Sequence, residues 1–163
     1  MDATKRATGE RQQLRQNELK WGKELMGAGF TVIPAVILDR QEALGLDALD
    51  VNIILHLACR WWFADNPPHP SKRTIAKAMG VDPSTVRRRI AALEKEGLLE
   101  REARFSRERG QEANRYHLGK LIKAATPFAL EEIESRAQAR RSREERRARK
   151  RPKLHVVPPV EKA

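Results

Sequence analysis

The sequence predicts a mainly α-helical domain with one small β-hairpin, an α+β fold that is followed by a basic C-terminal extension. Two short helical patterns flank a single glycine within residues 71–97, and two basic strand patterns follow within residues 98–118. No large apolar residue occurs from 134 to 153, so a helix there has no face to bury. We therefore expect three regions: a flexible segment over 1–19, one domain over 20–123 and a basic extension over 124–163.

The part before the long central helix has a mixed pattern. The first 19 residues are polar, and we expect them to be frayed. TVIPAVIL combines β-branched residues with a proline, which predicts an edge strand or an extended arm that leads into a short helix over DRQEALG. Three large apolar residues are expected to pack on the domain: Trp21, Met26 and Phe30.

Residues 47–63 form the strongest helical pattern of the chain. Asp47 is suited to the N-cap, and Asp50 lies three residues later, where a carboxylate interacts favourably with the helix dipole. The apolar stripe consists of Val51, Ile54, Leu57, Ala58 and Trp61. We expect this helix in the domain core, with a contact between two copies of the chain as the alternative. The prolines of NPPHP then predict a rigid connector.

Two helices joined by a tight turn are predicted over SKRTIAKAMGVDPSTVRRRIAALEKEG. Ser71 is suited to cap the first helix, and Gly80 supplies the turn. Asp82 is suited to cap the second helix, in which Pro83 takes the first position, where a missing N–H costs nothing; Gly97 ends it. The expected buried residues are Ile75, Ala76 and Met79 in the first helix and Val86, Ile90 and Leu93 in the second.

The second helix has an exposed face that is suited to DNA. At about 100° per residue, the buried stripe leaves small, hydroxylated and basic side chains outside: Ser84, Thr85, Arg87, Arg88, Arg89, Ala91 and Lys95. The small first turn lets the backbone approach phosphates, and the guanidinium groups can reach base edges. The alternative is that three consecutive arginines form only a solvated helix face.

A basic hairpin is predicted after the second helix. REARF and EANRYHL supply the strands, and SRERGQ forms a polar loop in which Gly110 is available for a positive φ. Its arginines are Arg101, Arg104, Arg107, Arg109 and Arg115. A two-stranded hairpin is marginal alone, so we expect four residues to anchor it to the helices: Leu99, Phe105, Tyr116 and Leu118. We interpret Tyr116 as a core aromatic rather than a platform for base stacking.

The stretches NPPHPSKRTIAKAMGV and Val86 to Leu99 resemble the winged helix-turn-helix domains of bacterial and phage regulators. The extended segment, short helix and long helix ahead of them resemble the N-terminal domains of phage and plasmid replication organisers. The resemblance implies that the second helix enters the major groove and that the hairpin lies along the backbone or the minor groove. We predict DNA contacts at Ser71, Lys72, Arg73, Ser84, Thr85, Arg87, Arg88, Arg89, Arg107, Arg109 and Arg115.

Positive charge is concentrated in two regions. The chain has a net charge of +11, with +7 over residues 71–123 and +8 over residues 135–163. We expect the C-terminal region to be either disordered or a solvated helical extension stabilised by Glu–Arg pairs. RRARKRPK would add salt-dependent phosphate affinity, or would be a solvated tail without a role. LHVVPPVEKA is a candidate partner motif.

The sequence gives no sign of enzymatic chemistry. His56, His69, His117 and His155 are scattered, and a single cysteine cannot complete a structural zinc set or a disulfide. Gly27-Ala28-Gly29 lacks the third glycine of a dinucleotide loop. We expect no enzyme activity, cofactor, metal or membrane span, and a cytoplasmic, nucleoid-associated location.

These observations predict a sequence-specific protein that binds double-stranded DNA, with a bacterial or mobile-element transcriptional regulator as the first interpretation. A plasmid or phage replication initiator or organiser is the alternative. A further alternative is an RNA-binding or general nucleic-acid scaffold led by the tail. A homodimer and a protein partner of the tail are also compatible with the sequence.

Overall fold

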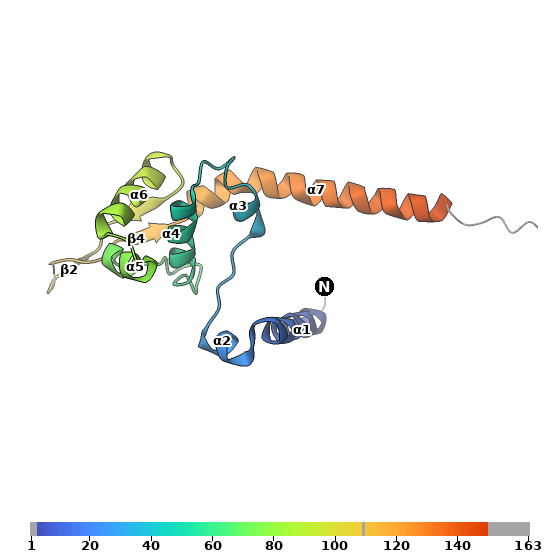
Figure 1. Ribbon diagram of the computed structural model, residues 1–163, viewed down its shortest axis with the longest axis horizontal. Coiled ribbons are helices and arrows are strands. Elements are labelled where there is room, and N and C mark those ends of the chain that lie inside the picture. The colour runs from blue at the N-terminus through green and yellow to red at the C-terminus, as the bar shows by residue number, and fades with distance from the viewer. Residues whose placement is uncertain (1–2, 109, 150–163) are drawn as a thin grey trace, which may run out of the picture. The chain divides into compact units, whose positions relative to one another are not determined.

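The computed structural model describes residues 3–108 and 110–149 (Figure 1). The chain divides into two compact units, Met1–Ala125 and Thr126–Ala163. The described helices are α1 (Ala3–Trp21), α2 (Lys23–Ala28), α3 (Ala35–Asp39), α4 (Ala48–Ala58), α5 (Lys72–Met79), α6 (Pro83–Lys95) and α7 (Gly119–Arg149). The strands are β1 (Glu100–Glu102), β2 (Phe105–Ser106), β3 (Gly110–Gln111) and β4 (Arg115–His117). The prediction of a mainly helical fold with a small hairpin is confirmed.

The N-terminal segments differ from the prediction. Residues 3–21 are helical in α1, where a frayed segment was expected. An extended arm precedes Pro34, as expected, but the helix predicted over 39–45 is wrong: α3 begins at Ala35, and residues 40–45 form turns. Pro34 is the N-cap of α3 with φ −61° and ψ 127°, so the chain enters the helix directly after the proline instead of continuing as a strand.

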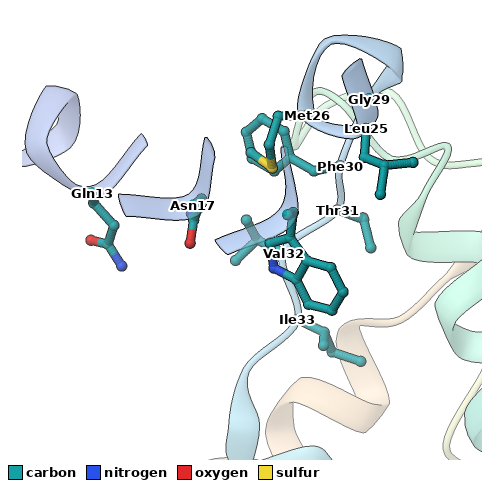
Figure 2. Close-up of a pocket in the computed structure, with 10 residues that line it drawn as sticks. Gln13, Asn17, Leu25, Met26, Gly29, Phe30, Thr31, Val32 and Ile33 are labelled. Atoms are coloured by element: carbon teal, nitrogen blue, oxygen red, sulfur yellow. The ribbon is translucent and has the colours of Figure 1, made fainter. Parts of the chain in front are cut away.

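The large apolar residues of this segment line a groove of their own outside the domain core. Trp21, Met26 and Phe30 line a groove of about 560 Å³ between α1, α2 and the extended arm. Figure 2 shows Met26, Phe30 and Val32 at this groove. Because Trp21 and Phe30 are 57% and 52% exposed, the expectation that they pack on the domain is wrong.

The central helix α4 begins as predicted and ends earlier. Asp47 accepts hydrogen bonds from the backbone N–H groups of Leu49 and Asp50, and the Asp50 carboxylate accepts one from the N–H of Asp47, which completes a capping box. The helix ends at Ala58 instead of residue 63. The guanidinium of Arg60 donates to the carbonyl of His56 at 2.9 Å and satisfies a carbonyl of the last turn.

The two motif helices have the predicted capping. Ser71 Oγ accepts from the N–H of Thr74 at 3.0 Å, and Asp82 Oδ1 accepts from the N–H of Ser84 at 2.7 Å. Gly80 takes the left-handed conformation with φ 67° and ends α5. The buried side chains of these helices are Ile75, Ala76, Val86, Ile90 and Leu93, which pack with Val51, Ile53, Ile54 and Leu57 of α4 in the domain core.

The wing is an interrupted antiparallel hairpin. Strand β1 pairs with β4, with Arg101 opposite Tyr116, and β2 pairs with β3, with Phe105 opposite Gln111. Leu99, Tyr116 and Leu118 are buried, and the N–H of Tyr116 donates to the carbonyl of Pro68 at 2.9 Å, which joins the hairpin to the NPPHP connector. The anchoring role predicted for Phe105 is wrong, because its side chain is 74% exposed. Figure 1 shows β2 at the end of the wing far from the helices.

The second unit consists, in its described part, of the continuation of α7 to Arg149. Its side chains are mostly exposed, and Glu–Arg pairs at helical spacing support it: Arg136 with Glu132 at 2.7 Å and Arg140 with Glu144 at 3.0 Å. Of the two predicted states, disordered or helical, the described residues take the helical one. The LHVVPPVEKA stretch and the last four residues of RRARKRPK lie outside the described residues.

Candidate nucleic-acid interface

Helix α6 is held rigidly and leaves one face outside. Its buried side chains Val86, Ile90 and Leu93 are at most 1% exposed, which fixes the rotation of the helix on the core. Ser84, Arg87 and Arg88 are exposed, and Thr85 is half-buried. Within the described residues, neither Arg87 nor Arg88 forms a salt bridge. These donors are therefore free to meet a ligand.

Arg89 belongs to a different environment from its two neighbours. Its guanidinium lies between α6 and the N-terminus of α4, where it pairs with Asp50 at 2.5 Å and also with Asp47. The hydrogen bond to Asp50 raises the pKa of Arg89. This side chain therefore joins the two helices through two carboxylates, and its contact with DNA stays a prediction.

Helix α5 presents a cation close to the arginines of α6. Lys72 is half-buried, and its pKa is lowered by this burial and by the nearby positive charges of Arg101 and Arg87. Because neighbouring cations repel Lys72, an approaching phosphate would interact favourably with its ammonium group. Ser71 is occupied as the N-cap, with its Oγ 2.8 Å from Thr74 Oγ1, and Arg73 is exposed.

The wing carries less free positive charge than its composition suggests. Arg101 pairs with Glu94, Arg104 with Glu112 at 3.0 Å, and Arg115 with Glu102 at 3.1 Å. The hydrogen bond from Arg101 lowers the pKa of Glu94. Arg107 is exposed at the end of the wing, and Arg109 lies outside the described residues. Three wing arginines are therefore neutralised by carboxylates, and Arg115 can contact DNA only in competition with Glu102.

A cavity beside α5 includes two basic residues, Arg60 and Lys77, that are not among the predicted DNA contacts. The cavity has a volume of about 530 Å³ and is lined by Arg60, Ser71, Arg73, Thr74, Lys77 and Ala78. Lys77 lies four residues after Arg73 on the exposed side of α5, so helical spacing could have revealed it. Arg60 could not be found in this way, because its place depends on the turn that ends α4.

The described residues show neither a metal site nor a membrane-spanning helix. They contain no group of three or more His, Cys, Asp or Glu side chains placed to hold a metal ion. No helix in this part of the chain is long and apolar enough to cross a membrane.

Comparisons with known proteins agree with this architecture. Residues 44–99 match a family model described as a helix-turn-helix domain. The crystal structure of the N-terminal domain of the DnaD protein from Geobacillus kaustophilus HTA426 is similar in fold, with a TM-score of 0.51 and 16% sequence identity, over 71% of this chain and 93% of that one. Comparison with curated protein sequences gives no match. The chain thus carries a helix-turn-helix domain, followed by a short wing and a long C-terminal helix.

Proposed function

We propose that the chain binds double-stranded DNA with sequence preference by placing α6 in the major groove. The observation that carries this proposal is the exposed face of α6, where Ser84, Arg87 and Arg88 stand on a helix that is capped at Asp82 and locked by its buried stripe. A rigid helix with free guanidinium groups suits the major groove, where an arginine can donate two hydrogen bonds to a guanine.

The neighbouring groups supply phosphate contacts. Lys72 and Arg87 lie close enough for their charges to interact, and one phosphate between them would relieve that repulsion. Arg73 and Arg107 are exposed further along α5 and the wing. In this arrangement Arg88 reads a base, and the other cations fix the position of the domain on the duplex.

We further propose that the bound DNA is a replication origin, and that the chain acts as a replication initiator or organiser. A helix-turn-helix domain alone serves many roles, so it does not select one. The fold likeness to the DnaD N-terminal domain extends over 71% of the chain, well beyond residues 44–99 of the helix-turn-helix match. It points in the same direction as the sequence resemblance to replication organisers.

The role of a transcriptional regulator is the second candidate, supported by the sequence resemblance to bacterial and phage regulators. Enrichment of random duplexes on the purified full chain, followed by sequencing, gives the preferred site. Mapping bound sites in the host genome then separates the roles: repeated sites beside an origin support the proposed function, and sites confined to promoters support a regulator. A palindromic site would indicate that two copies of the chain bind together.

The third interpretation, a general nucleic-acid scaffold led by the tail, makes a different prediction. In that case no duplex sequence would be enriched, and a chain without residues 136–163 would lose its binding altogether. A retained footprint after this deletion supports recognition by α6.

A further inference from the structure

The cavity beside α5 has the chemistry of an anion site. Three of its lining residues are cations, Arg60, Arg73 and Lys77, two carry hydroxyl groups, and none is acidic. The hydrogen bond from Arg60 to the carbonyl of His56 holds one end of the guanidinium in place. Within the described part of the chain, no carboxylate forms a salt bridge with Arg73 or Lys77. Such a set of donors favours a polyanion.

Two exposed aromatic side chains lie two and three residues after Arg60 in the loop that joins α4 and α5. Trp62 and Phe63 are 71% and 68% exposed, whereas Trp61 is half-buried with its indole Nε1 enclosed. Because consecutive Cα atoms are about 3.8 Å apart, the Cα of Trp62 lies within about 8 Å of that of Arg60. The aromatic pair therefore belongs to the same short segment of chain as Arg60, which lines the basic cavity.

We propose that this cavity and the aromatic pair form a second nucleic-acid site, for single-stranded DNA. Phosphates would occupy the cavity between Arg60, Arg73 and Lys77, and unpaired bases would stack on Trp62 and Phe63. A basic groove beside aromatic rings is the usual way in which proteins hold single strands, because every base offers a π face that stacking in a duplex covers. The aromatic part of this site lies apart from α6, the helix proposed to enter the major groove, because Figure 1 shows the α4–α5 loop at the end of α4 away from α6.

Comparing the affinities of variants for single-stranded and for duplex DNA distinguishes the proposed single-strand site from the duplex surface of α6. The full chain, Trp62→Ala/Phe63→Ala and Arg88→Ala are titrated by fluorescence anisotropy against a labelled oligothymidine of about 20 nucleotides and against a duplex of the same length. We expect the double variant to bind the single strand about 10-fold or more weakly, with duplex affinity unchanged. Arg88→Ala should weaken the duplex and leave the single strand unaffected. Lys77→Ala should weaken binding to the single strand and flatten its dependence on salt.

Tryptophan fluorescence tests the stacking itself. A base stacked on Trp62 should quench its indole emission, so oligothymidine should quench the wild type and Trp21→Phe, and the quenching should largely disappear in Trp62→Phe. Melting temperatures should be equal throughout, since Trp62 and Phe63 are exposed.

Three results would overturn the proposal. Unchanged single-strand affinity in Trp62→Ala/Phe63→Ala would exclude these rings from the site. An equal loss on single strand and duplex would make them part of the duplex surface. If the wild type does not bind oligothymidine but self-associates through these rings, the loop is a site of contact between copies of the chain. None of these results tests the proposal that α6 recognises a duplex sequence. The titration of Arg88→Ala against duplex tests that proposal separately.

Discussion

Arg89 on α6 donates two hydrogen bonds to the carboxylate of Asp50 on α4, with 3.0 Å from Nε to Oδ1 and 2.5 Å from Nη2 to Oδ2. Asp50 is only 2% exposed, so this pair joins two core helices through a buried charge. The adjacent Arg88 points into solvent from the same helix. The two neighbouring arginines therefore have different roles: Arg89 stabilises the fold, and Arg88 is a proposed DNA contact.

Replacing Arg89 tests this division. We expect Arg89→Met to lower the free energy of unfolding by about 3 kcal/mol, because Asp50 would keep a buried charge without its partner. Urea denaturation followed by circular dichroism at neutral pH measures it. Arg88→Met is the matched control and should change stability by no more than about 0.5 kcal/mol. Equal losses in the two variants would show that the ion pair does not stabilise the fold.

The same cluster makes stability depend on pH. Burial acts to raise the pKa of Asp47, but hydrogen bonds from the N–H of Asp50 and from Arg89 outweigh it and hold the pKa below 3.8. A carboxyl whose pKa is lower in the folded state stabilises the protein above its unfolded pKa, and this stabilisation disappears as the pH falls through the folded pKa.

Asp47→Asn keeps a capping side chain and removes only the charge. It should lower the melting temperature at neutral pH, and its difference from the wild type should shrink as the pH falls below 3.8. Asp65→Asn, at an exposed loop position, is the control and should follow the wild type at every pH. A difference that grows towards acid pH would contradict the assigned direction.

The two ends of the wing should respond differently to truncation. Leu99→Ala should cost about 2–5 kcal/mol of stability, because the side chain is 1% exposed and its removal leaves a cavity. Phe105→Ala should cost no more than about 0.5 kcal/mol, since that ring is 74% exposed. Chemical denaturation of both variants measures the costs, and a large loss for Phe105→Ala would place the ring in the core.

Local chemistry explains which features the sequence predicted. The caps at Ser71 and Asp82 and the turn at Gly80 depend on neighbours within three residues, so composition reveals them. Phe105 continues the alternating strand pattern, but that pattern does not show where the hairpin leaves the core. The partner of Arg89 is 39 residues away, which no local pattern indicates.

The end of α4 was missed for a related reason. The apolar pattern continues through Trp62, whereas the helix ends at Ala58, where Arg60 turns back to the carbonyl of His56. For the same reason the sequence does not predict the basic cavity that Arg60 lines.

The C-terminal residues should contribute affinity without preference. Residues 136–163 hold 11 basic and 3 acidic side chains, and a chain that ends at Ser135 retains the whole helix-turn-helix domain. We expect its melting temperature and preferred sequence to be unchanged, with weaker binding to random duplexes and a smaller dependence on salt. Titrations at two salt concentrations and thermal melting measure this. A large fall in melting temperature, or a lost preference, would contradict it.

The most direct test of duplex recognition by α6 compares Arg88→Ala with the wild type on the enriched duplex and on a scrambled duplex of equal length. If Arg88 reads a base, the variant should lose about 1–3 kcal/mol on the enriched duplex and much less on the scrambled one. Arg107→Ala, at the exposed end of the wing, is the matched control and should weaken both duplexes alike. An equal loss on both duplexes for Arg88→Ala would contradict sequence recognition by this residue and reduce it to a phosphate contact.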